Sequence, residues 1–117
     1  MKRLAEGEGK VMEILWERGS LSAREISLIA AETIGWNKNT TYTVLTRLAE
    51  KGLIVRQEPG FVCSAAVSRE EMQKREASSL LERVFGGSRK ALFSALLEDE
   101  KLSAEEIAEL RELIENR

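Results

Sequence analysis

Four threonines fall within the seven residues from Thr40 to Thr46, in the stretch WNKNTTYTVLTRLAEKG. At about 100° per residue on a helix, Thr41 shares a side with the apolar Val44 and Leu48, whereas the other threonines avoid it. Lysine and glutamate have a higher helix propensity than threonine and would suit a purely solvated side better. Short hydroxyl side chains suit a surface that approaches a hydrogen-bonding partner closely, such as the base edges in the DNA major groove. The plain alternative is an amphipathic helix whose solvent side happens to contain threonine.

The polar side of this segment provides candidate DNA contacts of two kinds. Arginine bonds guanine through two nitrogens, and threonine offers a base its hydroxyl or thymine its methyl group, so these residue types can read base edges. Lysine and arginine near the ends of the segment can bind phosphates and set the position of the helix. Two roles remain open for Tyr42: contact with the DNA groove, or packing beneath a neighbouring hairpin. The residues expected to face base edges and nearby phosphates are Asn39, Thr43, Thr46 and Arg47, and those expected to hold phosphates are Lys38, Thr40, Lys51 and Arg56.

The net charge of −2 does not favour a nucleic-acid partner, but its distribution does. Residues 1–67 contain nine Lys and Arg against eight Asp and Glu, a net of +1, whereas residues 68–117 contain nine against twelve, a net of −3. Between residues 36 and 56 four cations stand against Glu50 alone, a net of +3. Phosphate binding depends on the local face more than on the total charge, and the positive cluster coincides with the threonine segment.

The composition lacks the side chains that most enzymes use. The chain has no histidine and a single cysteine, Cys63, so nucleophile–base pairs and the common zinc ligand sets cannot be assembled. The 20 Asp and Glu alternate with Lys and Arg on polar helix sides. We therefore expect neither an enzyme nor a bound cofactor or metal. A lone cysteine in an apolar strand is expected to lie in the core, with redox sensing as the alternative.

The sequence also predicts a cytoplasmic protein. Its 43% apolar and 32% charged residues are typical of a folded soluble chain. No apolar run approaches the roughly 18 residues that cross a bilayer, and the first residues, MKRLAEGEGK, lack the apolar stretch of a signal peptide. A single cysteine gives no disulfide framework.

Three helices and a β-hairpin are predicted to hold the threonine segment in place. The first helix reads EGKVMEILWERG, repeats its apolar residues at helical spacing and ends at Gly19. The second opens at Ser22 with Glu25 three residues later, which is the pattern of a capping box, and is stopped by Gly35.

The third helix is predicted to begin with Asn39 as its N-cap and to run to Lys51. Two strands, 53–57 and 61–65, follow around a Pro-Gly turn. Three helices and then a hairpin, within residues 1–67, are the order of a winged helix-turn-helix domain, whose third helix enters the major groove while the hairpin, or wing, lies against the backbone.

Residues 68–117 are predicted to form an all-helical dimerisation domain, with three amphipathic helices starting at Ser68, Ser88 and Ser103. Glu71 and Glu106, three residues after Ser68 and Ser103, give the first and third of these helices the pattern of a capping box. Fifty residues of this kind bury only a thin core, so we expect a second copy of the chain to cover their apolar sides. A homodimer would also present paired recognition helices to a two-fold symmetric operator. The alternative is a self-contained three-helix bundle packed on the N-terminal domain. The residues expected at the dimer interface are Leu80, Leu81, Val84, Phe85, Leu92, Leu96, Ile107, Leu110, Leu113 and Ile114.

These stretches together resemble the penicillinase-repressor family of bacterial winged-helix regulators. The resemblance covers residues 5–115 and rests on VMEILWERGSLSAREI, WNKNTTYTVLTRLAEKGLI and VFGGS, with VMEILW and TTYTVLTRLAEKG the most specific pieces. It implies a homodimeric transcriptional repressor that binds an inverted-repeat operator in front of β-lactamase or related genes. The resemblance further implies the route known from the best-known members, in which a membrane sensor protease pathway leads to cleavage of the repressor in its C-terminal domain.

Three features depart from the family pattern. The copper-responsive branch has Cys-x-Cys pairs near the C-terminus, and this chain has none, so we do not expect metal sensing by that route. The β-lactam branch is cut at an Asn–Phe bond, and the matching pair here is Ala95–Leu96, the candidate for regulatory cleavage. The wing reads RQEPGFVCS with Glu58 at its tip, so we expect weak phosphate contact there, with Arg56 as the main contributor. The alternative function is a winged-helix protein–protein interaction module without DNA binding, which would have an acidic or apolar third helix.

Overall fold

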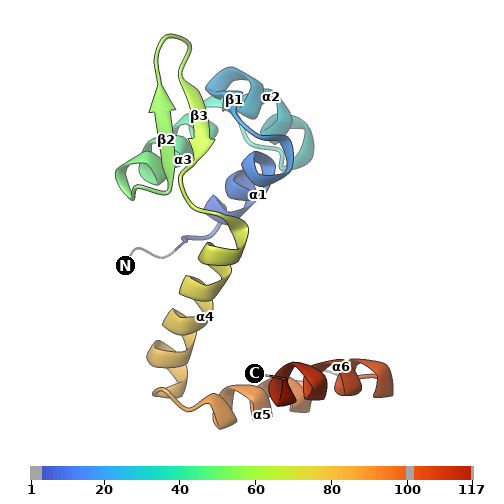
Figure 1. Ribbon diagram of the computed structural model, residues 1–117. Coiled ribbons are helices and arrows are strands. Elements are labelled where there is room, and N and C mark those ends of the chain that lie inside the picture. The colour runs from blue at the N-terminus through green and yellow to red at the C-terminus, as the bar shows by residue number, and fades with distance from the viewer. Residues whose placement is uncertain (1–3, 100–101, 117) are drawn as a thin grey trace. The chain divides into compact units, whose positions relative to one another are not determined.

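The computed structural model describes residues 4–99 and 102–116 of the protein (Figure 1). The chain divides into two compact units, residues 1–77 and 78–117. The predicted fold class, a winged-helix domain followed by further helices, is confirmed. The predicted domain boundary after residue 67 stays a prediction, since one helix starts just beyond it and continues across both units. The elements of the described residues are α1 (Glu8–Arg18), β1 (Leu21–Ser22), α2 (Ala23–Thr33), α3 (Lys38–Glu50), β2 (Ile54–Gln57), β3 (Val62–Ala65), α4 (Arg69–Phe85), α5 (Arg89–Asp99) and α6 (Ala104–Glu115).

The core of the first unit is built from one side of each of α1, α2 and α3. Apolar residues recur at helical spacing in these helices, so each has a continuous side that is removed from water on packing. Thr41 is also fully buried in α3, as its position on the apolar side predicts. The hairpin and the first turns of α4 complete the core, whose members are Val11, Met12, Leu15, Ala23, Ile26, Val44, Leu45, Leu48, Leu53, Ile54, Cys63, Val67 and Met72.

The start of α2 is the capping box that the sequence predicts. The Ser22 hydroxyl accepts a hydrogen bond from the Glu25 N–H at 3.1 Å, and the Glu25 carboxylate accepts one from the Ser22 N–H at 3.0 Å. The hydrogen bond from the Ser22 N–H, and after it the Ser22 hydroxyl, hold the pKa of Glu25 below its usual value because they stabilise the charged carboxylate.

The start of α3 differs from the prediction. Its N-cap is Asn37, whose side-chain oxygen accepts the Thr40 N–H at 2.8 Å, and Asn39 lies inside the first turn. Asn37 has the extended backbone that an N-cap requires. Both asparagines suit an N-cap, and the tertiary path of the chain decides between them. The error moves the helix start by two residues but leaves the sides of α3 unchanged, because helical periodicity sets them.

The wing is part of a three-stranded antiparallel sheet in the order β1–β3–β2. The β2 and β3 strands pair from Ile54 opposite Ala65 to Gln57 opposite Val62, and each begins one residue later than predicted. The β1 strand was not predicted, since two residues before a helix leave no periodic signal. It pairs with β3 and so joins the wing to the start of α2.

Both tryptophans of the chain lie in the first unit. The indole N–H of Trp16 donates to the Val67 carbonyl at 2.9 Å, and its ring packs against the core. Trp36 precedes α3 and lies against the start of α1, where a Cβ added at Gly7 would come within 3.0 Å of the ring. Gly7 has φ of +89°, so this N-cap needs glycine for its backbone conformation as well as for space.

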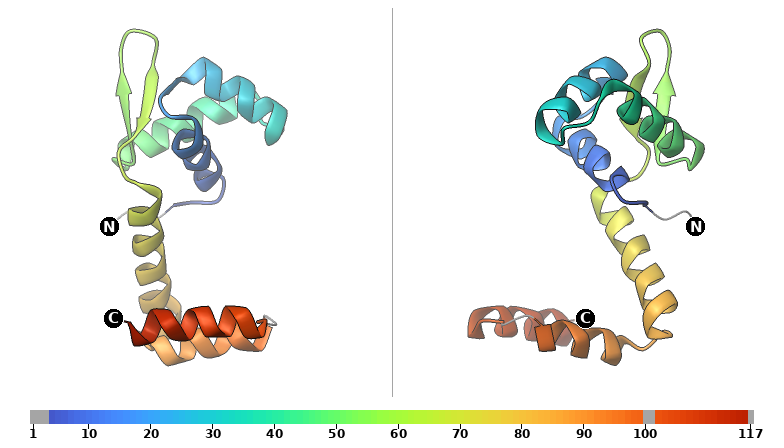
Figure 2. Two further views of the ribbon diagram at one scale, coloured as in Figure 1. Left: turned by 45° about the vertical axis from the view of Figure 1, so that its right-hand side comes forward. Right: turned by 180° about the vertical axis from the view of Figure 1, so that it is seen from behind.

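The second unit contains α5, α6 and the end of α4 (Figure 2). The hydroxyls of Ser88 and Ser103 accept N–H groups of the first turns of α5 and α6, and α6 has the full capping box that was predicted. Among the described residues of this unit, Leu81 is the one buried hydrophobic side chain. None of the described helices is both long and apolar enough to span a bilayer.

Candidate nucleic-acid interface

The predicted division of α3 into two sides is confirmed. Its buried residues are Thr41, Val44, Leu45 and Leu48, all on the side assigned to the core. The polar residues proposed to read base edges are all exposed. Three of the four, Asn39, Thr43 and Arg47, line one open hollow of about 290 Å³ on the helix surface, together with Asn37, Thr40 and Val44.

The hydroxyls of two exposed threonines, Thr43 and Thr46, are bound to the backbone of their own helix. Thr43 Oγ1 donates to the Asn39 carbonyl at 2.9 Å, and Thr46 Oγ1 donates to the Tyr42 carbonyl at 3.0 Å. Each hydroxyl proton is therefore in use, and the γ-methyl group and an oxygen lone pair remain for a partner. Two methyl groups and two acceptors therefore lie on the exposed side of α3, which also carries Arg47.

Lys51 is half-buried and forms an ion pair that sequence reasoning missed. Its Nζ lies 2.6 Å from Oε1 of Glu8, whose side chain is 1% exposed. The Ala5 N–H donates to the same oxygen at 2.5 Å. The predicted phosphate contact of Lys51 remains a prediction, and the structure adds a packing role. No local pattern pairs residues 8 and 51, so this ion pair leaves no signal in the sequence.

The wing residue Arg56 is exposed and oriented by two neighbours. Its guanidinium carbon lies 3.6 Å from the centre of the Phe61 ring, and its Nε donates to Glu58 Oε2 at 2.6 Å. Phe61 in turn meets Tyr42 edge to face, with ring centres 5.8 Å apart and an interplanar angle of 87°. Tyr42 therefore packs beneath the wing, which is one of the two roles left open for it.

A second hollow, of about 340 Å³, lies between α2 and the start of α3. It brings Arg24 and Ser27 of α2 together with Asn37, Lys38 and Tyr42. Arg24 and Ser27 were not among the predicted contacts, because in the sequence of α2 they are ordinary polar residues. Only the packing of α2 on α3 places them beside Lys38, where an arginine and a hydroxyl can hold the same phosphate group.

The residues predicted for the dimer interface are mostly exposed. Leu81 is buried within the chain, and Phe85 and Leu92 are half-buried. Seven of the ten are exposed: Leu80, Val84, Leu96, Ile107, Leu110, Leu113 and Ile114.

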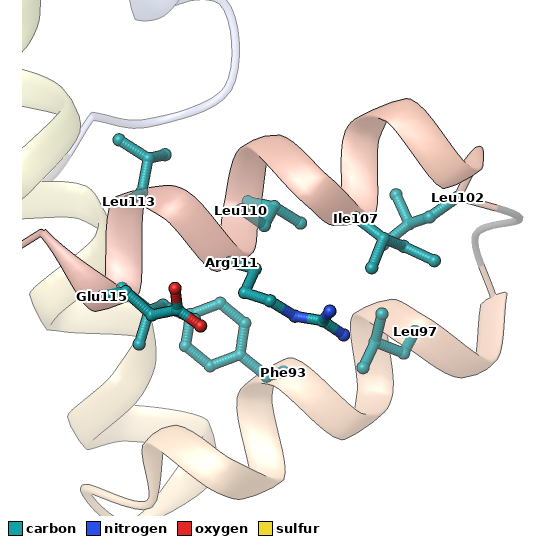
Figure 3. A pocket seen from close by; sticks show the side chains of 9 residues that line it. Phe93, Leu97, Leu102, Ile107, Leu110, Arg111, Leu113 and Glu115 are labelled. Atoms are coloured by element: carbon teal, nitrogen blue, oxygen red, sulfur yellow. The ribbon is translucent and has the colours of Figure 1, made fainter.

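An apolar groove of about 590 Å³ runs between α5 and α6 (Figure 3). The α5 residues that line it are Phe93 and Leu97, which the predicted interface did not include. The opposite wall comes from Leu102 and α6, with Ile107 and Leu110 labelled beside Arg111 in Figure 3. The Ala95–Leu96 pair lies within α5, with Leu96 half exposed.

Comparison with known proteins agrees with this geometry. The model of the penicillinase repressor family matches residues 4–116. The chain is 28% identical over 115 residues to the penicillinase repressor of Bacillus licheniformis, covering 97% of this chain and 90% of that protein. It is 29% identical over 113 residues to the penicillinase repressor of Staphylococcus aureus, covering 95% of this chain and 90% of that protein. It is 28% identical over 116 residues to the methicillin resistance regulatory protein MecI of Staphylococcus aureus strain N315, covering 97% of this chain and 94% of that protein.

Proposed function

This chain belongs to the penicillinase repressor family, and we propose that it represses transcription as a homodimer bound to an inverted-repeat operator. Members of this family are transcriptional regulators, which confirms that the protein is not an enzyme. The observation that most supports DNA as the partner is the exposed side of α3. That side brings an amide, hydroxyls and a guanidinium together on one rigid helix.

In the proposed complex α3 lies in the major groove. Arg47 bonds guanine through its terminal nitrogens, and Asn39 and Thr40 lie at the start of the helix, where side chains reach bases and the nearest phosphates. Thr43 and Thr46 direct their methyl groups to thymine, because their hydroxyl protons are bound to backbone carbonyls. The residues proposed to hold phosphates are Lys38, Lys51 and Arg56, with Arg24 and Ser27 added from α2.

The apolar side chains of the second unit support a homodimer. Nine large hydrophobic side chains among its described residues are exposed. Apolar surface of this extent on a small helical unit is unstable in water unless another surface covers it. A second copy offers the same apolar surface in return and creates a self-complementary two-fold interface. The two copies would then present two α3 helices to the two halves of one operator.

The regulated genes and the release of repression are also proposals. The relatives are named for penicillinase and for methicillin resistance, and we propose β-lactam resistance or related genes as targets. A sensor protease would act at Ala95–Leu96 if the family's route is kept. Both residues lie within α5, so cutting there requires local unfolding of that helix first. A repressor must reach the chromosome, so the cytoplasmic location expected from the sequence belongs to the same proposal.

The test is binding of the purified protein to duplex DNA, with operators found by mapping bound sites across the genome. Affinity for the operator should fall steeply between two salt concentrations, because phosphate contacts release counterions. One operator should bind two chains. A protein that ignores duplex DNA at low salt would instead support the protein–protein interaction module.

A further inference from the structure

Four side chains from α3 and the wing form a continuous stack, which we call the cation–aromatic ladder: Lys38, Tyr42, Phe61 and Arg56. The Nζ of Lys38 lies 5.5 Å from the centre of the Tyr42 ring, and the Phe61 ring meets Tyr42 edge to face. The guanidinium carbon of Arg56 lies over the Phe61 ring, 3.6 Å from its centre. Cations favour the faces of aromatic rings, and aromatic rings favour edge-to-face contact, so each step of the ladder is attractive.

Phe61 is the member of the ladder that the backbone holds most firmly. Its φ is +49°, a conformation that residues other than glycine rarely adopt. Its carbonyl accepts the Ala23 N–H at 2.9 Å, which fixes this turn to the start of α2. Phe61 therefore contacts α2 through its backbone and α3 through its ring, and a strained residue held in this way indicates a functional constraint.

Arg56 is left with a defined set of donors. One face of the guanidinium lies on Phe61, and Nε is bound to Glu58. No described residue forms a hydrogen bond or an ion pair with its two terminal nitrogens. These two nitrogens match the oxygens of a phosphate group, and their direction is set by the ring beneath and by the Glu58 carboxylate.

We propose that Phe61 is a positioning residue that couples the wing to α3. The position of α3 in the major groove then sets the orientation in which the Arg56 guanidinium binds a backbone phosphate. This inference rests on the proposed function and adds a coupling to it. A long arginine on an exposed strand loses rotamer freedom when it binds, and holding it in place beforehand removes that cost. The wing of this chain has few cations, so the orientation of Arg56 matters more than it would in a basic wing.

The test is a double-mutant cycle on operator affinity, measured at several salt concentrations. In the wild-type background, Arg56→Gln should lower the slope of log affinity against log salt by about one, as for one lost phosphate contact. Phe61→Leu keeps the apolar volume, removes the ring, and should weaken binding about threefold to fivefold, the size of one exposed cation–aromatic contact. In the Phe61→Leu background, Arg56→Gln should have less than half of its wild-type effect. Phe61→Tyr should restore wild-type binding.

The outcomes separate the coupling from the proposed function. Equal effects of Arg56→Gln in both backgrounds would overturn the coupling while leaving DNA binding intact, whereas a wild-type protein without salt-dependent binding would overturn the function itself. Lys10→Gln removes one exposed cation of α1 as the matched control, and its effect should be the same in both backgrounds. If Phe61→Leu does not fold, the same cycle can be run from α3. The effect of Arg56→Gln on operator affinity is then compared between Tyr42→Leu, which removes the ring, and Tyr42→Phe, which keeps it.

Discussion

Nζ of Lys51 lies 2.6 Å from Oε1 of Glu8, so an ion pair joins the C-cap of α3 to the first residue of α1. The Glu8 side chain is 1% exposed and that of Lys51 is 24% exposed. Water cannot stabilise the Glu8 carboxylate, so the lysine and the Ala5 N–H do so. The C-terminal end of α3 is thereby held to the start of α1.

Lys51→Met should destabilise the first unit, because it leaves the Glu8 carboxylate buried without its cation. The expected loss in the free energy of unfolding is about 3 kcal/mol. Glu8→Gln is the matched control: it keeps the shape and an acceptor for Ala5, and a lysine can turn to water, so about 1 kcal/mol is expected. Urea unfolding followed by tryptophan fluorescence measures both, because both tryptophans lie in this unit. Equal losses in the two variants would contradict this account.

Arg47→Ala should lower operator affinity by about 1–3 kcal/mol and relax the preference for one base pair of the half-site. The reason is the loss of a two-nitrogen contact with guanine. Arg18→Ala, which removes an exposed arginine from the end of α1, is the control and should leave the base preference unchanged. Affinities for operators with single base-pair changes provide the measurement. An unchanged base preference in Arg47→Ala would remove Arg47 from the reading surface.

Thr43→Val and Thr43→Ser separate the two groups of one side chain. Valine keeps the methyl group and loses the hydroxyl, which the structure shows bound to Asn39, so operator affinity should change little. Serine loses the methyl group and should cost about 0.8 kcal/mol, the value of one buried methyl or methylene. Fluorescence anisotropy with a labelled operator can resolve this difference. The opposite order would mean that the hydroxyl leaves Asn39 and bonds a base.

Leu113→Glu should break the dimer, because it places a charge in the apolar surface proposed to be shared by two chains. Leu113 is 68% exposed in the chain, so the change should hardly affect the folding of one copy. Leu28→Glu is the control, since Leu28 is 62% exposed but lies on α2. Sedimentation velocity should give a single chain for Leu113→Glu and a dimer for Leu28→Glu. A dimer in both would exclude this part of α6 from the interface.

Cys63 should be inert to alkylation in the folded protein at neutral pH. Burial in β3 raises the pKa of the thiol, since the thiolate loses its hydration, so the reactive form is rarer than in an unfolded chain. Mass spectrometry after iodoacetamide treatment should show modification in denaturant and little without it. Operator binding after treatment of the folded protein should be unchanged. Rapid modification with loss of binding would revive redox sensing.

Periodic and local patterns were the reliable part of the prediction. The sides of α3 follow from a 3.6-residue repeat, and the capping boxes at Ser22 and Ser103 follow from two residues three apart. Each of these signals lies within a few residues of sequence. They sufficed to predict the winged-helix order and the exposed positions of the candidate DNA contacts.

The features that were missed depend on contacts between distant segments. The choice of Asn37 over Asn39 as N-cap depends on the path of the chain from α2. The pairing of β1 with β3 and the Glu8–Lys51 ion pair link residues forty or more positions apart, and neither leaves a local pattern. Arg24 joins the candidate interface for the same reason, through the packing of α2 on α3.

The inward hydrogen bonds of Thr43 and Thr46 have a consequence for modified DNA. Thymine differs from cytosine in the major groove partly through its C5-methyl group, and 5-methylcytosine displays a methyl group at the same position. In the proposed complex these two threonines meet a base through their methyl groups, which can pack against the C5-methyl group of thymine or of 5-methylcytosine. Replication copies the base sequence, whereas methylation can change within one generation, so occupancy of such an operator would respond to the methylation state of the chromosome.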